Sequence, residues 1–187
     1  MTTTFVVRVE DRPGVLTRVA EVFRRRAFNI ESLTVGHTEA PGVSRMTIVV
    51  EADADAARRL EAHLYKLVNV LRVDTIAERP AVFRDLAMIK VATTAETRAQ
   101  IMQLVEVFRA RVVDVAPASL IIEITGTEDK IDGLLEVLRP YGVLEMARTG
   151  RLAMVRGAEP ATRQKRLPDV DLDDGAPATE PGVAQSV

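Results

Sequence analysis

Two charged residues, a proline and a glycine follow the first apolar run and form the segment 11–14, DRPG. Asp11 is a good N-cap residue for a helix beginning here, and proline is favoured in a first helical turn. Gly14 has no Cβ, so the backbone N–H groups of Gly14, Val15 and Leu16 stay accessible. Free N–H groups at a helix N-terminus favour a bound carboxylate or phosphate. A cap and turn with no ligand would show the same residues, and the local motif alone favours that simpler interpretation.

A second polar group stands at the start of the apolar run 28–35. Asn29 lies there, and asparagine is poor in strands but common in turns. Its side-chain amide can donate hydrogen bonds to a ligand carboxylate, although a residue that only ends a turn would look the same. Three arginines at 24–26 precede it. They are fewer than the runs of about five to eight that suggest nucleic-acid patches, so they are interpreted as charges that complement a helix C-terminus.

Several kinds of chemistry are disfavoured by what the chain lacks. It has no cysteine, and its two histidines, His37 and His63, lie far apart. A disulfide framework, a thiolate or histidine metal site and a catalytic triad are therefore not expected. Asp53 and Asp55 are interpreted as charges at a helix start. No apolar run is long enough to span a membrane and no signal peptide is recognised, and a net charge of −2 gives no basic field for nucleic acid.

An internal repeat indicates which helices and strands position these residues. The run 21–24, EVFR, recurs at 106–109, and both copies lie on apolar patterns with helical spacing. The predicted order is βαββαβ, twice. It comprises strands 4–10, 28–35, 44–51 and 70–77 with helices 15–23 and 55–67, then strands 85–92, 111–115, 119–126 and 143–155 with helices 101–108 and 127–139.

This order predicts an α+β fold of two tandem ferredoxin-like units, each an antiparallel sheet with its helices on one face. The first unit is expected at residues 1–78 and the second at 84–156, with a short linker at 79–83. Residues 157–187 hold four prolines, three glycines and few large aliphatic side chains. We expect them to be a disordered tail, because they cannot bury enough apolar surface to offset chain entropy.

The strands are apolar on both faces, which bears on assembly. Residues 5–7 and 46–50 show no clean alternation of polar and apolar side chains, whereas a sheet with helices on one face should be polar on the other. A unit of about 75 residues also has a marginal core of its own. Pairing with another protomer, edge to edge or face to face, would cover the second face, and we expect an obligate dimer.

Taken together, these stretches resemble the small, regulatory subunit of acetolactate synthase, also called acetohydroxyacid synthase. The resemblance spans residues 4–157. The Asp-x-Pro-Gly-Val-Leu pattern alone would indicate only an ACT domain, a module that senses amino acids, and the longer runs make the resemblance more specific. The matching stretches are 10–19, EDRPGVLTRV; 28–36, FNIESLTVG; 44–49, SRMTIV; 66–73, KLVNVLRV; and, in the second unit, 108–109, 113–115, 125–126 and 150–157.

The resemblance implies a role in branched-chain amino acid biosynthesis. Subunits of this family pair their ACT domains side by side as homodimers, and a branched-chain amino acid, typically valine and otherwise leucine or isoleucine, binds between them as a feedback inhibitor. They activate a separate, large catalytic subunit that carries thiamine diphosphate, magnesium and FAD. We therefore expect a cytoplasmic, non-catalytic subunit that binds no cofactor, nucleic acid or membrane.

The resemblance also implies an effector site shared by two protomers. One wall would come from Asp11, Gly14, Val15 and Leu16, and the other from Asn29 and Ile30 of the neighbouring protomer. The residue types fit a zwitterion: helix N–H groups and the Asn29 amide for its carboxylate, Asp11 for its ammonium. Aliphatic side chains suit an isopropyl group, whose burial is worth roughly 1.5–3 kcal/mol. Some members carry asparagine in place of Asp11, and the added charge would either strengthen ammonium binding or repel the carboxylate.

Two other functions stay open from the residues. ACT-like units also serve in stand-alone amino-acid sensors and transcription regulators, but no helix-turn-helix segment supports that alternative. An independent enzyme is disfavoured, because no catalytic constellation is found.

Overall fold

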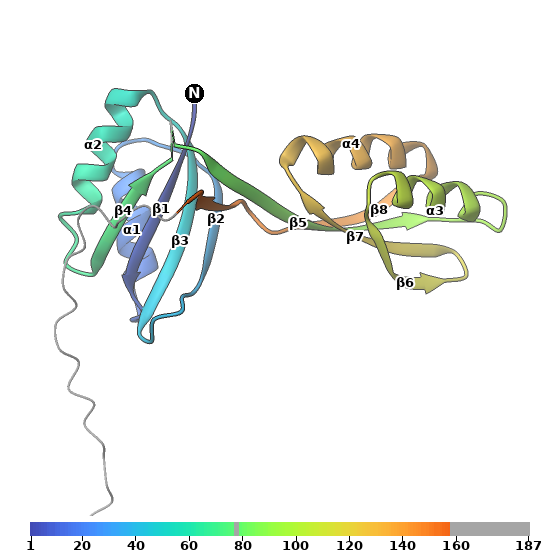
Figure 1. Ribbon diagram of the computed structural model, residues 1–187, viewed down its shortest axis with the longest axis horizontal. Coiled ribbons are helices and arrows are strands. Elements are labelled where there is room, and N and C mark those ends of the chain that lie inside the picture. The colour runs from blue at the N-terminus through green and yellow to red at the C-terminus, as the bar shows by residue number, and fades with distance from the viewer. Residues whose placement is uncertain (77–78, 158–187) are drawn as a thin grey trace, which may run out of the picture.

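The structure is a computed structural model that describes residues 1–76 and 79–157 (Figure 1). Two units follow one another along the chain, and each is an antiparallel sheet with two helices on one face. The predicted tandem α+β fold is thus confirmed. The predicted tail lies outside the described residues, apart from Gly157.

The first unit has the strand order β2-β3-β1-β4, so β2 and β4 are the edges of its sheet. Phe5 and Val7 of β1 face the helices and are fully buried, in one core with Phe23 of α1 and Leu60 of α2. The rings of Phe5 and Phe23 meet edge to face, with centroids 6.0 Å apart. The elements are β1 (Thr2–Glu10), α1 (Val15–Arg24), β2 (Ile30–His37), β3 (Val43–Glu51), α2 (Ala54–Leu64) and β4 (Val70–Thr75).

The second unit repeats this arrangement with the strand order β6-β7-β5-β8. Ile89 of β5, Ile122 of β7 and Leu134 of α4 are fully buried in its core. Its elements are β5 (Ala81–Ala92), α3 (Arg98–Val107), β6 (Arg111–Ala116), β7 (Ser119–Gly126), α4 (Glu128–Leu138), a 3-10 turn (Arg139–Tyr141), β8 (Val143–Arg148) and β9 (Leu152–Val155).

The long strand β5 joins the two units (Figure 1). A linker is predicted at 79–83, but Ala81 already begins β5, whose first four residues pair antiparallel with β9. The single strand predicted at 143–155 is correspondingly two strands: β8 belongs to the second sheet, and β9 pairs with the start of β5 beside the first sheet. Ala153 of β9 is buried in a small core with Val6 and Ile76, and this burial favours a paired ribbon over an irregular linker.

The β5–β9 ribbon covers part of the outer face of the first sheet. Val6 of β1 points to that face, away from the helices, and packs with Ile76, Ala153 and the partly buried Phe83. The apolar second face, which the sequence assigns to a dimer partner, is therefore covered in part by the chain itself. In the second sheet, Met88 on the outer face is 44% exposed.

Candidate effector-binding site

Gly14, not Asp11, is the N-cap residue of α1. Its φ of +79° lies in the left-handed region that glycine adopts without strain, and its side is open: no heavy atom lies within 4 Å of the position that a Cβ would take. The predicted cap at Asp11 is wrong, because Pro13 and Gly14 form a turn that starts the helix beyond its reach. Oδ2 of Asp11 instead lies 3.2 Å from Nδ1 of His37, at the end of β2.

The turn presents free backbone donors. The N–H of Val15 donates to the carbonyl of Arg12 at 3.3 Å, and the N–H of Arg18 makes the first helical bond, to Gly14, at 3.1 Å. The N–H groups of Gly14 and Leu16 find no acceptor within the part of the chain that the structure describes. An anionic group placed here would gain hydrogen bonds and a favourable helix dipole.

The aliphatic side chains expected at the site differ in how far they are exposed. Val15 is only 3% exposed and packs in the core, so it presents its backbone rather than its side chain. Leu16 is 42% exposed beside it. Ile30, at the start of β2, is partly buried against the core. Within one chain, Leu16 is thus the exposed aliphatic side chain at the turn.

Asn29 and Ile30 lie at the other end of α1. The ten residues of this helix span about 15 Å, Gly14 precedes the helix and Asn29 follows its C-terminal end. Asn29 is exposed, and its Nδ2 donates to Oε1 of Glu31 at 2.6 Å. One chain therefore does not bring the two predicted walls together around a single amino acid.

The edge strand β2 carries exposed apolar side chains. Leu33 and Val35 are 37% and 43% exposed. They are paired with Ile48 and Met46 of β3, which are buried on the helix face, so they share that face at the open edge. Leu33 and Val35 thus form an apolar strip along this edge. An open strand edge with apolar neighbours is a surface on which another strand can pair.

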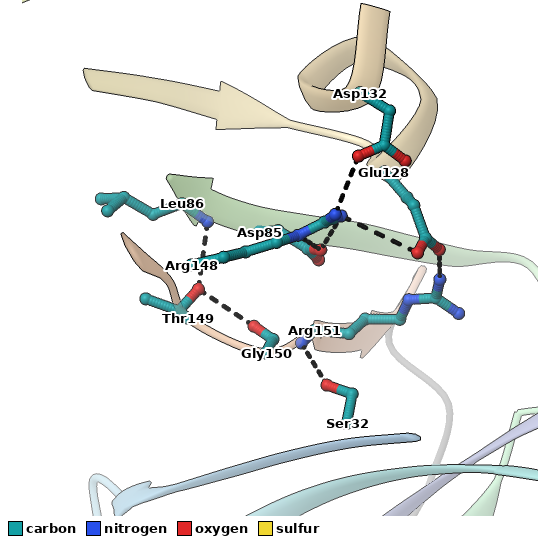
Figure 2. Close-up of polar contacts among 9 residues, drawn as sticks. All are labelled: Ser32, Asp85, Leu86, Glu128, Asp132, Arg148, Thr149, Gly150 and Arg151. Atoms are coloured by element: carbon teal, nitrogen blue, oxygen red, sulfur yellow. Dashed lines mark hydrogen bonds and ion pairs between the residues drawn. The ribbon is translucent and has the colours of Figure 1, made fainter. Parts of the chain in front are cut away.

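A second polar cluster, which the sequence analysis does not identify, lies between the two units (Figure 2). Nη2 of Arg148 lies 2.5 Å from Oδ2 of Asp85, and Nη1 lies 3.1 Å from Oδ1 of Asp132. Burial is the largest single influence and opposes the charge of Arg148. The hydrogen bonds to Asp85, together with the charges of Asp85, Asp132 and Glu128, outweigh burial and raise the pKa of the guanidinium. Glu128 pairs with both Arg148 and Arg151.

The segment after β8 holds the two units against each other. The N–H of Arg151 donates to Oγ of Ser32 on β2 at 2.8 Å (Figure 2). A Cβ on Gly150 would lie 2.6 Å from this Oγ and 2.8 Å from Oγ1 of Thr34. Because the charges of the cluster pair with one another, its arrangement fits a structural connection to β2 better than a ligand site.

Over residues 1–76 and 79–157 no group of acidic and histidine side chains could hold a metal ion, and no helix is long and apolar enough to cross a membrane.

Comparisons with known proteins agree on one family. Residues 5–72 match the model of the "AHAS small subunit-like ACT domain", and residues 84–157 match that of the "Small subunit of acetolactate synthase". The chain is 51% identical over 154 residues to the probable acetolactate synthase small subunit of Archaeoglobus fulgidus, an alignment that covers 82% of this chain and 96% of that protein. It is 49% identical over 156 residues to the acetolactate synthase small subunit of Mycolicibacterium smegmatis, an alignment that covers 83% of this chain and 92% of that protein. The crystal structure of the small subunit from Thermotoga maritima matches with a TM-score of 0.79 and 40% identity, covering 85% of this chain and 99% of that one.

Proposed function

Because the chain belongs to the family of acetolactate synthase small subunits, we propose that it activates the large catalytic subunit of that enzyme and makes it sensitive to valine. Its role is regulatory, in branched-chain amino acid biosynthesis in the cytoplasm. The chain itself is non-catalytic: thiamine diphosphate, magnesium and FAD belong to the catalytic subunit. We assign the effector-binding ACT domain to residues 1–78 and the second domain to 84–156, with the start of β5 lying within the connection at 79–83.

The observation that carries this proposal is the position of the two half-sites relative to the edge strand β2. Asn29 stands at the start of β2, and the end of β2 at His37 lies beside Asp11 and the turn at Gly14. If the β2 strands of two protomers pair antiparallel about a two-fold axis, the start of one strand lies beside the end of the other. Asn29 of each protomer then approaches Gly14 of its partner, and the strip with Val35 is buried.

The completed site has the groups that a branched-chain amino acid requires. The free N–H groups of Gly14 and Leu16, with the amide of the neighbouring Asn29, receive the carboxylate. Asp11 faces the ammonium group, and Leu16 with the neighbouring Ile30 encloses the aliphatic side chain, leucine or isoleucine being accepted in place of valine. In the effector complex, the Asn29 amide exchanges its hydrogen bond to Glu31 for one to the ligand.

Reconstitution tests the proposal directly. The chain is mixed with the acetolactate synthase catalytic subunit of the same source, and acetolactate formation from pyruvate is measured with and without valine. We expect no activity from the chain alone, a severalfold higher rate for the mixture than for the catalytic subunit alone, and loss of that gain with valine. A chain that neither co-purifies with the catalytic subunit nor alters its rate, yet binds valine, would be a stand-alone sensor.

A further inference from the structure

Three arginines stand in a transverse row on the outer face of the first sheet. Arg8 of β1 is paired directly with Arg45 of β3 on one side and with Arg72 of β4 on the other. All three point away from the helices, because Val7 and Val9 on either side of Arg8 lie in the helix-side core. Like charges at directly opposed positions destabilise a sheet. The row therefore calls for a compensating negative charge.

Within the described ranges 1–76 and 79–157, few acidic side chains form ion pairs with these three arginines. Oδ1 of Asp74 lies 2.7 Å from Nη2 of Arg72, and Arg79 shares this carboxylate at 3.7 Å. Arg8 has Glu39 at 3.9 Å, on a side chain that is 78% exposed.

The positive charge and the N–H donors of Arg45 and Arg72 are only partly compensated. Within residues 1–76 and 79–157, Arg45 forms no ion pair at contact distance and is attracted only at longer range by Asp74 and Glu39, while its guanidinium donates to the carbonyl of Ala153 on β9. Burial first, and then the charge of Arg8, lower the pKa of Arg45. Nε of Arg72 is buried with no acceptor among the described residues. Among the described residues, Arg8, Arg45 and Arg72 thus hold more positive charge and more N–H donors than the neighbouring acceptors satisfy.

These side chains line a recess rather than a flat surface. A cavity of about 160 Å³ lies between the outer face of the first sheet and the β5–β9 ribbon. Among the described residues, its lining has four arginines and one carboxylate, that of Asp74, and Met154 and Val155 of β9 supply its apolar side. The arginines are Arg8, Arg45, Arg72 and Arg79. Arg72 is recessed, with 13% of its side chain exposed, whereas Arg8 is accessible at 32%. A small ligand can enter such a recess more readily than a protein surface can.

We propose that this arginine row binds the phosphate or pyrophosphate group of a small-molecule ligand. The planar guanidinium fork matches phosphate oxygens in a bidentate geometry. A carboxylate carries one charge and two oxygens and would satisfy one arginine of the row. A phosphate group carries up to two charges and at least three acceptor oxygens, which suits several converging guanidinium groups. This site lies on the opposite face of the sheet from α1, so it is distinct from the effector site and goes beyond the proposed function.

Calorimetric titration of the full chain with inorganic pyrophosphate, in chloride buffer of low ionic strength, tests the proposal. We expect one saturable site per chain. Arg8→Gln should weaken binding at least about tenfold, the effect of one lost charge-assisted hydrogen bond. Arg8→Lys, which keeps the charge but not the planar fork, should bind with intermediate affinity. Arg24→Gln, on the exposed surface of α1, is the matched control and should bind as the original chain does.

Thermal unfolding gives a second readout that a purely structural role would not reproduce. Without pyrophosphate, Arg8→Gln should unfold at the same or a higher temperature than the original chain, because repulsion within the row is relieved. Pyrophosphate should raise the unfolding temperature of the original chain and of Arg24→Gln, but not that of Arg8→Gln.

Two results would overturn the proposal. One is the absence of pyrophosphate binding, or equal binding by Arg8→Gln and the control. The other is binding that is seen only after Asp171, Asp173 and Asp174 are changed to asparagine, because the acidic C-terminal segment of the chain would then be the occupant.

Discussion

Gly14 combines three properties on which the proposed effector site depends: a left-handed backbone, an open side and a free N–H. A Cβ here would have no heavy atom of the described residues within 4 Å, so we expect the effect of a substitution on ligand binding to come from its charge and from the neighbouring protomer. Asn29 supplies the complementary amide from the far end of α1. Each residue alone has a simple structural explanation, and together they form a site only across two chains.

Gly14→Asp should abolish inhibition by valine while activation of the catalytic subunit is retained. The substitution places a negative charge against the carboxylate of the ligand. Gly14→Asn is the matched control, because both residues tolerate the left-handed backbone at a cost of about 1 kcal/mol and only aspartate adds the charge. Valine inhibition curves of the reconstituted enzyme measure the difference. Equal loss of inhibition in both variants would contradict the electrostatic explanation.

Asn29→Ala should likewise remove valine inhibition, since it removes the amide donor. Mixed dimers of Asn29→Ala with Gly14→Asp should regain one intact site of two, because one pair of half-sites comes from unmodified residues. Calorimetry with valine on purified heterodimers, with both homodimers as controls, tests this. Confirmed heterodimers that bind no valine would argue against a site shared between protomers, or would indicate that both sites must act together.

Glu21 provides a check on the electrostatics of α1. Hydrogen bonds from Arg24, with Nε 2.7 Å from Oε2, and then from Arg25 lower the pKa of Glu21 from 4.5 to about 2. Because the pKa is lowered in the folded state, any stabilisation from this pair is complete above pH 4.5 and is lost as the pH falls towards 2. Arg24→Ala should raise the pKa of Glu21 towards 4.5 in an NMR titration of its carboxylate. Arg26→Ala should leave it unchanged, and a rise as large as that in Arg24→Ala would refute the assignment.

At the scale of elements, β2 connects three parts of the molecule. Its start carries Asn29 and Ile30, its open edge is the surface proposed for dimer pairing, and Ser32 in its middle accepts the hydrogen bond from Arg151 (Figure 2). A change in β2 on effector binding would therefore reach the second unit directly through the segment at Gly150.

Gly150→Ala tests that connection. The new Cβ would lie 2.6 Å from Oγ of Ser32 and 3.2 Å from the carbonyl oxygen of Leu33, a backbone atom that cannot move aside alone. We expect a loss of about 1–3 kcal/mol in unfolding free energy and faster amide exchange in β9. Gly133→Ala in α4, where the Cβ would lie 3.4 Å from the ring of Phe108, should instead be neutral or stabilising by up to about 1 kcal/mol. Unchanged stability of Gly150→Ala in denaturant titrations would show that the segment is free to shift.

At the scale of the whole molecule, two units of similar fold expose different surfaces. The first presents the β2 edge and the Gly14 turn, and the β5–β9 ribbon covers part of its outer face. The second unit leaves Met88 exposed on the corresponding face. Dimer formation is therefore expected through the edge of the first unit rather than through the face of its sheet.

Val35→Asp should convert the dimer to a monomer and remove valine binding, because the charge would be buried at the β2 edge. Val113→Asp in β6 is the matched control, since Val113 is exposed to a similar extent, 47% against 43%, on the second unit. Light scattering after size-exclusion chromatography gives the mass of each variant. A Val35→Asp variant that stays dimeric would place the interface elsewhere.

The βαββαβ order follows from the sequence alone, because the repeated EVFR run and the spacing of apolar residues reflect helices and strands that form from nearby residues. The candidate site residues were also recognisable, since turn glycines and asparagines have local causes. The N-cap at Gly14 rather than Asp11 also has a local cause, the turn at Pro13 and Gly14. Two features were decided only by the tertiary structure. Residues 143–155 divide between two sheets. The second apolar face, which predicted a dimer, is buried in part by the chain's own β9. Periodicity tells which residues are buried, but contacts between residues far apart in sequence determine what buries them.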